Sequence, residues 1–188
     1  MIKTLSDLRS FLDAEKKIYI SSNPRTALID YLVQVPSVRI WRYIKLLRKS
    51  EYYYNNSRKS IFHAIMYFFY RRRKNIYGTF LGIEIDENTC DIGLKIWHTG
   101  NVVVSGAAKI GKNCILHGGN CIGNTGLVGQ FEAPVIGDNV DIGVGASIIG
   151  NVNIADSVRI GAGAVVLNSC DLPNSLLVGI PARVIKTY

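Results

Sequence analysis

An aliphatic residue recurs at every sixth position through much of the C-terminal half of this 188-residue chain. The first series is Val104, Ile110, Leu116 and Ile122, and the second is Ile136, Ile142, Ile148, Ile154, Ile160, Val166, Leu172, Val178 and Val184. A period of six fits neither an α-helix, which repeats every 3.6 residues, nor a simple strand, which repeats every two. It is typical of a solenoid, in which each repeat stacks on its neighbours.

Two further positions of the hexad favour a parallel β-helix. Glycine often follows the aliphatic residue, and small or β-branched residues stand four positions after it: Ala108, Cys114, Val140, Ala146, Val152, Val158, Ala164, Cys170 and Ala182. In a triangular β-helix each face takes one hexapeptide, the aliphatic side chain points inward, and a small residue fits the tight corner. With three hexapeptides to a coil, residues 83–184 predict about five coils.

The N-terminal segment follows different rules. Residues 1–77 contain none of the 18 glycines and hold 16 Lys or Arg against 5 Asp or Glu, whereas residues 78–188 hold 6 against 9. We predict helices that begin with a Thr4–Asp7 capping box, at Asn23-Pro24 and at Ser37, and a last helix over about residues 57–74. The chain is therefore expected to be mainly β, with a basic α-helical region over residues 1–77 and the β-helix over residues 78–188.

Several classes of protein are disfavoured. The longest strongly apolar stretch, Ile61–Tyr70, is about half of what a bilayer span needs, and the N-terminus lacks the features of a signal peptide. The cysteines, Cys90, Cys114, Cys121 and Cys170, form no CxxC pair, so reduced, buried thiols in a cytoplasmic protein are expected. The basic segment carries no nucleic-acid motif; its charges are expected to be solvated, or to attach the chain loosely to an anionic membrane surface.

Function is sought where the period breaks. His98 stands six residues before Val104, where an aliphatic residue is expected, and is either a satisfied core histidine or a functional group. Ile122 and Ile136 are 14 residues apart, two hexads plus two residues. The intervening segment, 125–135, is therefore expected to leave the face as a loop that is either a spacer or a ligand cover.

The histidines also raise the question of a metal. His117 lies 19 residues after His98, about one coil further along, and imidazoles are common zinc ligands. The third histidine, His63, lies in the helical segment, so no metal is expected.

The segment from Gly82 to Lys186 resembles the serine acetyltransferase branch of the hexapeptide-repeat acyltransferases. The matching pieces are Gly82–Ile85, Trp97–Val104, Ile122–Gly126, Ala133–Gly143, Ile160–Val166 and Gly179–Ile185. The likeness is greatest to the shorter enzymes of this branch that O-acetylate capsular and exopolysaccharide sugars. The resemblance implies a left-handed parallel β-helix, an acetyl-CoA-dependent O-acetyltransferase, and a homotrimer or a dimer of trimers.

The resemblance also assigns roles. His98 becomes the general base that takes the proton of the acceptor hydroxyl, a task that suits a neutral imidazole near neutral pH. The family places an acidic residue at the position of Glu84 to orient this imidazole, and Asp86 is the alternative on the same side of the strand. The positions that match acetyl-CoA contacts are Gly123, Asn124, Thr125, Val144, Gly145, Ala162 and Gly163, with Arg183 and Lys186 expected to meet phosphates.

Two departures from the family pattern concern the acceptor. Serine acetyltransferases carry an Arg-His pair and an acidic residue where this chain has Phe131-Glu132-Ala133-Pro134 and Trp97. An exposed Trp97 beside the base suits the face of a sugar, and His117 and Glu132 are the other candidate acceptor residues. We therefore expect a sugar or lipid-linked glycan hydroxyl, with L-serine as the alternative and a non-catalytic solenoid scaffold as the alternative from another class.

Overall fold

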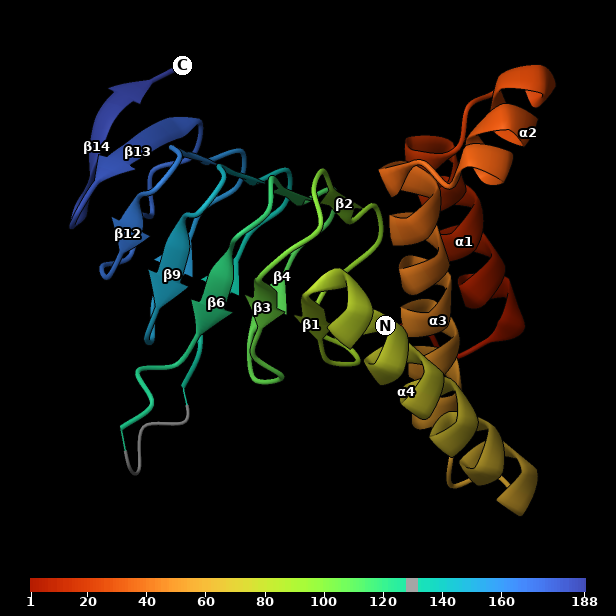
Figure 1. Cartoon of the computed structure of the whole chain (residues 1–188). Helices are drawn as coiled ribbons and strands as arrows, with labels where there is room; N and C mark the ends of the chain where they lie inside the picture. The colour runs from red at the N-terminus through yellow and green to blue at the C-terminus, as the bar shows by residue number, and fades with distance from the viewer. Residues whose placement is uncertain (128–131) are drawn as a thin grey trace. The chain divides into compact units, whose positions relative to one another are not determined.

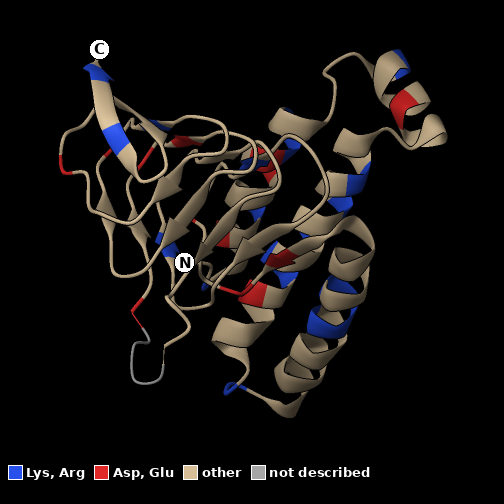
Figure 2. Cartoon of the chain, turned by 60° about the vertical axis from the view of Figure 1, so that its left-hand side comes forward, with Lys and Arg blue, Asp and Glu red and all other residues tan. Residues whose placement is uncertain are grey.

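A computed structural model describes residues 1–127 and 132–188 and divides the chain into two compact units, residues 1–82 and 83–188. The first unit is helical, and the second is a left-handed parallel β-helix made of short strands (Figure 1). Lys and Arg lie mainly on the helices, and few of them lie on the coils (Figure 2). The predicted fold class is confirmed.

The first two helices begin where their capping residues predict. α1 (Leu5–Tyr19) has the full capping box, because the Thr4 hydroxyl accepts a hydrogen bond from the Asp7 N–H at 3.0 Å and the Asp7 carboxylate accepts one from the Thr4 N–H at 2.8 Å. α2 (Pro24–Val33) follows Asn23, whose side-chain oxygen accepts a hydrogen bond from the Arg25 N–H at 3.0 Å.

The starts of the other two helices differ from the prediction. α3 (Pro36–Asn56) is not capped by Ser37; Pro36 lies in its first turn, and Val35 precedes it without a side-chain cap. Proline is suited to this position because the first N–H groups of a helix have no partner inside it. α4 (Ile61–Leu81) begins after Ser60, whose hydroxyl accepts from the His63 N–H.

α4 also extends beyond residue 74, where the last helix was predicted to end, and crosses the boundary expected between residues 77 and 78. Gly78 is therefore buried inside a helix and does not begin a coil. The helix ends at Gly82, which adopts a left-handed conformation with a φ of 66°. Glycine adopts this conformation at a helix end without the steric cost that a Cβ imposes.

A buried ion cluster joins α1 to α3 inside the helical unit. The Arg48 guanidinium, fully buried, lies 2.6 Å from a carboxylate oxygen of Glu15 and 2.9 Å from one of Glu51. Burial opposes its charge, but the carboxylates of Glu51 and Glu15 outweigh burial and raise the pKa of Arg48 above its ordinary value.

The β-helix has three faces. Face A contains β1 (Ile83–Ile85), β3 (Val102–Val104), β6 (Cys121–Gly123), β9 (Ser147–Ile149) and β12 (Val165–Val166). Face B contains β4 (Lys109–Ile110), β7 (Val135–Ile136) and β10 (Asn153–Ile154). Face C contains β2 (Lys95–Ile96), β5 (Ile115–Leu116), β8 (Asp141–Ile142), β11 (Arg159–Ile160), β13 (Ser175–Gly179) and β14 (Ala182–Thr187). The five parallel strands of face A correspond to five coils.

The hexad pattern predicts the interior of these coils. Every aliphatic residue of the two series from Val104 to Val166 is buried, and all the small corner residues named above are buried too. Equivalent positions pair in parallel register, as Ile142 does with Ile160 and Ile148 with Val166. The interior is thus a stack of aliphatic layers, one from each face of each coil.

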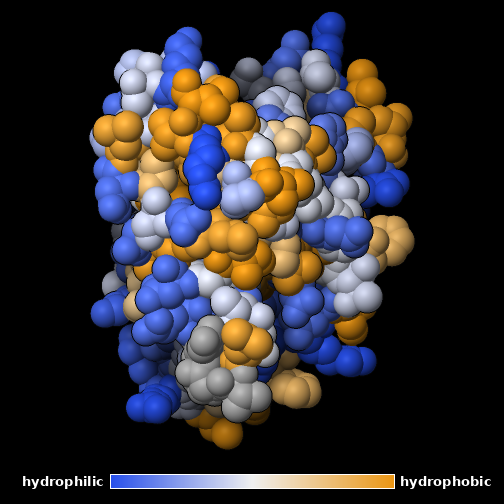
Figure 3. Space-filling view, turned by 90° about the vertical axis from the view of Figure 1, so that its left-hand side faces the viewer, coloured by the Kyte–Doolittle hydropathy of each residue, from blue (hydrophilic) through white to orange (hydrophobic). Residues whose placement is uncertain are grey.

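The last three positions of the series were predicted wrongly. Leu172 and Val184 are 50% and 44% exposed, and Leu177 is buried where Val178 was expected. Ile154 pairs with Cys170 and Ile160 with Leu177, 16 and 17 residues away instead of 18, so the hexad is already out of register before β13. After β13 the chain reverses, and β14 pairs with it antiparallel. Figure 3 shows hydrophobic side chains gathered over the C-terminal end of the β-helix, which agrees with the exposure of Leu172, Ile180 and Ile185.

The interruption between Ile122 and Ile136 is one hexad plus eight residues, not two hexads plus two. Lys109 pairs with Val135, 26 residues away, whereas Asp141 pairs with Arg159, 18 residues away. The eight additional residues enter between β6 and β7. Of the predicted 125–135 loop, residues 128–131 lie outside the part of the chain that the structure describes.

One cysteine differs from the expectation of buried thiols. Cys90, Cys114 and Cys170 are buried, and burial raises the pKa of the Cys114 thiol well above its ordinary value. Cys121 is exposed because it occupies an outward position of β6.

Candidate active site

The turns that lead from face C to face A form one edge of the β-helix, which we call the C–A corner. It consists of residues 97–101, 117–120, 143–146 and 161–164. Backbone hydrogen bonds run along this edge: Gly119 N–H donates to Gly100 O at 3.0 Å, Gly145 N–H to Gly118 O at 2.8 Å, and Gly163 N–H to Val144 O at 2.8 Å. The four turns are therefore stacked on one another.

His98 lies on the first of these turns, and this turn is longer than the others. Lys95 pairs with a residue 20 positions away, but Val103, after the turn, pairs with one 18 positions away, so the turn contains two additional residues. The buried position assigned to His98 belongs to Ile96, which pairs with Leu116. The interpretation of His98 as a substituted core residue is therefore wrong.

The His98 side chain is exposed, and within residues 1–127 and 132–188 its ring makes no hydrogen bond. Its backbone, in contrast, is closely supported from the next coil. A Cβ atom placed on Gly118 would lie 3.2 Å from the His98 Cβ and 3.3 Å from the His98 carbonyl oxygen. Gly118 thus allows the second coil to approach the histidine more closely than any other residue would.

His117 lies on the next turn of the C–A corner and has a hydrogen-bond partner that the sequence did not predict. Its Nε2 lies 2.8 Å from Oδ1 of Asp141, a residue of β8. Because a carboxylate only accepts, Nε2 carries the proton of this hydrogen bond. The sequence places Asp141 directly before the inward-pointing Ile142, and so predicts that its side chain points outward. That this side chain meets His117 could not be predicted, because the register between β5 and β8 depends on the size of the insertion between β6 and β7.

The same imidazole packs against Trp97. The two rings are stacked, with centroids 6.1 Å apart and planes inclined by 28°. Nζ of Lys95 lies 3.6 Å from the centroid of the Trp97 ring, a cation–π contact. Trp97 is nevertheless 47% exposed, so the predicted exposure of this side chain is confirmed.

The two candidate orienting carboxylates lie on face A. Glu84 and Asp86 are both exposed and flank the buried Ile85, as strand alternation predicts. In the described part of the chain no hydrogen bond joins His98 to either carboxylate. Asp86 leans toward the following coil, since a Cβ on Gly106 would lie 2.6 Å from its Oδ2.

Most of the predicted acetyl-CoA residues fall on two edges of face A, and Arg183 and Lys186 lie on β14. Val144, Gly145, Ala162 and Gly163 are exposed on the C–A corner, as His98 is. Gly145 and Gly163 have φ values of 69° and 67°, and nothing lies within 4 Å of where their Cβ atoms would be. This edge is therefore open to a ligand.

The second edge of face A carries three more of the predicted acetyl-CoA residues. Gly123, Asn124 and Thr125 stand at the far end of β6, where the Asn124 side chain accepts from Gly126 N–H at 3.2 Å and the Thr125 hydroxyl from Leu127 N–H at 3.4 Å. Both side chains thus form local turns at the start of the insertion.

The structure places the other three predicted site residues on β14 and just before β7. Arg183 and Lys186 are on β14; Arg183 donates to the carbonyl of Ala182 at 3.1 Å, and Lys186 lies over the Tyr188 ring. Glu132 accepts a hydrogen bond from the Asn151 side chain at 2.7 Å, which ties the end of the insertion to the next coil.

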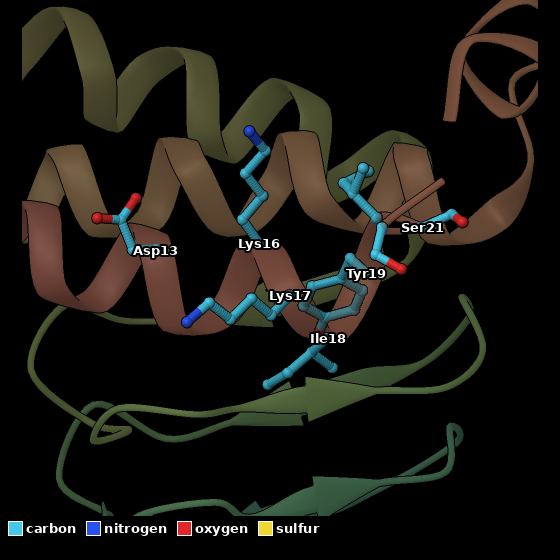
Figure 4. Close-up of a pocket in the computed structure, with 8 residues that line it drawn as sticks. Asp13, Lys16, Lys17, Ile18, Tyr19 and Ser21 are labelled. Carbon is cyan, nitrogen blue, oxygen red and sulfur yellow. The ribbon is translucent and has the colours of Figure 1, made fainter. Parts of the chain in front are cut away.

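Other types of site were sought across the described residues. They contain no group of three metal-ligating side chains, and none of their helices is long and apolar enough to cross a membrane. The helical unit has a pocket of about 780 Å³ at the end of α1 (Figure 4). It is lined by Asp13 and by residues 16–22, and includes none of the predicted site residues.

Comparisons with known proteins agree with this architecture. No family model matches the chain. The serine acetyltransferase of Staphylococcus xylosus is 38% identical over 77 residues, which are 40% of this chain and 35% of that protein. The chain thus matches about a third of the length of the curated relatives.

Among solved structures, soybean serine acetyltransferase complexed with serine superimposes with a TM-score of 0.76 and 27% identity over 96% of this chain and 70% of that chain. Neisseria gonorrhoeae serine acetyltransferase gives a TM-score of 0.74 and 28% identity over 98% and 68%. The chain therefore has the hexapeptide-repeat fold of the serine acetyltransferases, including their helical N-terminal region.

Proposed function

We propose that the chain is an acetyl-CoA-dependent O-acetyltransferase with His98 as its general base. The observation that carries this proposal is an exposed imidazole, without a hydrogen-bond partner among the described residues, on an enlarged turn of the C–A corner, the same corner whose third and fourth turns form the open edge at Gly145 and Gly163. An unprotonated ring nitrogen there accepts the proton of the acceptor hydroxyl as its oxygen attacks the thioester carbonyl. The resulting imidazolium returns that proton to the departing CoA thiolate.

The site is completed, in this proposal, by a second copy of the chain. Most of the predicted donor-binding residues lie on two edges of face A, and in the described part of the chain no hydrogen bond joins His98 to Glu84 or Asp86. A groove between two subunits of a homotrimer, as the resemblance implies, would bring one edge of each copy to the same acetyl-CoA. Arg183 and Lys186 remain the candidates for its phosphates.

The comparisons and the site favour different acceptors. The similar proteins are serine acetyltransferases, and one was solved with serine, which favours L-serine over the sugar predicted from the sequence. One observation favours a sugar hydroxyl as the second candidate: Trp97, 47% exposed, stands next to His98 where serine acetyltransferases carry an acidic residue. Because Lys95 already lies over this ring, a sugar would have to displace its side chain.

The decisive experiment measures CoA thiol release from acetyl-CoA with L-serine and with a panel of sugars and glycan intermediates. His98→Ala is expected to lower kcat by about 10²–10⁴-fold, the usual contribution of a general base, with the trimer intact. His63→Ala is the matched control, because His63 belongs to α4 and its ring contacts the Ser60 hydroxyl. Its turnover should equal that of the wild type.

Each outcome has a distinct meaning. Turnover with L-serine alone excludes the sugar acceptor, and turnover with a sugar alone excludes serine. Near-normal activity of His98→Ala contradicts the mechanism. The absence of turnover with every acceptor favours a non-catalytic scaffold.

A further inference from the structure

Four side chains from three successive coils form a continuous stack beside His98. We call Lys95, Trp97, His117 and Asp141 the indole stack. Its contacts are the Lys95 ammonium 3.6 Å from the indole centroid, the stacked imidazole of His117, and the 2.8 Å hydrogen bond from this imidazole to Asp141. The stack has a cation at one end and a carboxylate at the other, and it joins β2, the turn after β5, and β8.

We propose that the indole stack positions His98, and that His117 and Asp141 are positioning residues for the proposed acetyl transfer. Trp97 directly precedes His98 in the chain. The turn after it contains two additional residues and therefore departs from the regular coil geometry that holds the other corners. An irregular turn with an exposed histidine needs another restraint, and the anchored indole supplies it.

The backbone on either side of the histidine shows how this restraint acts. Trp97 N–H donates to Leu116 O at 2.9 Å, and Gly100 O accepts from Gly119 N–H at 3.0 Å, so the turn is held by the coil below at both ends. Among the described contacts of this turn, the stacking and cation–π contacts belong to Trp97. Asp141 orients His117, His117 supports the indole, and the indole fixes the start of the turn.

The role assigned to His117 is packing and not proton transfer, and this distinction gives the test. His117→Phe keeps an aromatic ring against Trp97 but has no nitrogen, whereas His117→Ala removes the ring. If the stack acts by position, His117→Ala lowers kcat about tenfold or more, because displacements near 1 Å cost up to about 10²-fold, while His117→Phe stays within about threefold of the wild type. The KM for acetyl-CoA should not change in either variant.

A double-mutant cycle isolates Asp141. Asp141→Ala and His117→Phe break the same hydrogen bond, so Asp141→Ala should lower kcat by no more than the same factor of about three and should have no further effect in His117→Phe. Two results would overturn the proposal. Equal losses in His117→Phe and His117→Ala would mean that the imidazole nitrogens act on substrate, and an additional loss from Asp141→Ala in His117→Phe would mean that Asp141 acts elsewhere.

A spectroscopic readout tests the stack without any activity. The chain has two tryptophans, and in Trp41→Phe the emission comes from Trp97 alone. His117→Ala should expose the indole to water and shift its emission to longer wavelength, whereas His117→Phe should not. Near-UV circular dichroism of the same two variants in the wild-type background serves if Trp41→Phe fails to fold.

The inference rests on the proposed function, but the two can fail separately. Wild-type protein that releases no thiol with any acceptor would overturn the proposed function. Identical Trp97 emission in Trp41→Phe alone and in Trp41→Phe combined with His117→Ala or His117→Phe would overturn the stack, whatever the activity.

Discussion

Gly118→Ala tests whether the close approach of Gly118 to the backbone of His98 controls catalysis. Gly118 has a φ of 111°, a conformation that residues with a Cβ rarely adopt, and such strain costs about 1–3 kcal/mol of stability. The new Cβ would also lie 3.2 Å from the Cβ of His98, so the histidine must move by a few tenths of an ångström. If a 1 Å displacement costs about 10²-fold in rate, a shift of this size predicts a loss in kcat of about three- to tenfold.

The measurement combines thermal unfolding with steady-state thiol release, and Gly119→Ala is the matched control. Gly119 lies on the same turn with a φ of 65°, but a Cβ there would meet the backbone of Gly145 at an ordinary 3.4 Å and would not meet His98. Both variants should lose stability, and only Gly118→Ala should lose turnover at a temperature where both are folded. Equal turnover in the two variants would refute the reasoning that links Gly118 to His98.

Three other predictions follow from which side chains are buried and which are exposed. Asn120→Ala removes the acceptor of Gly118 N–H and the donor to Gly143 O, both bonds being 2.8–2.9 Å long, and should destabilise the β-helix by about 1–3 kcal/mol in urea unfolding. Arg48→Met leaves two carboxylates in the helical unit without their cation and should cost about 3–5 kcal/mol, measured in the same way; a stable variant would contradict this. Native-state alkylation followed by mass spectrometry should label Cys121 first, because it is exposed while the other three thiols are buried. Labelling of Cys114 at the rate of Cys121 would disprove that order.

Local signals in the sequence were sufficient where the structure depends on local contacts. The Thr4–Asp7 capping box and Asn23-Pro24 predict the starts of α1 and α2, because capping hydrogen bonds join residues two or three positions apart. Ser37 failed as a cap because the helix already begins at Pro36, which places Ser37 inside its first turn.

The hexad predicted the β-helix core with similar success, but only where the coils are regular. A buried aliphatic residue is required at each inward position, so the period itself carries the information. The period does not say how many residues a corner or an insertion absorbs. For that reason His98 was assigned to the buried position of Ile96, and Asp141 was not recognised as a neighbour of His117.

By itself the sequence determined that aliphatic layers would stack into a β-helix behind a basic helical region, because burial of a periodic apolar series leaves few other solutions. It also singled out His98 as a break in that series and Trp97 as a departure from the serine acetyltransferase pattern. Only the tertiary structure decided what surrounds them: an enlarged corner, the close approach of Gly118, and the contacts of Lys95, His117 and Asp141. Except for the contact of Lys95 with Trp97, these contacts join residues from different coils. Which residues meet there depends on the parallel register between strands of successive coils, and the sequence of one coil does not determine that register.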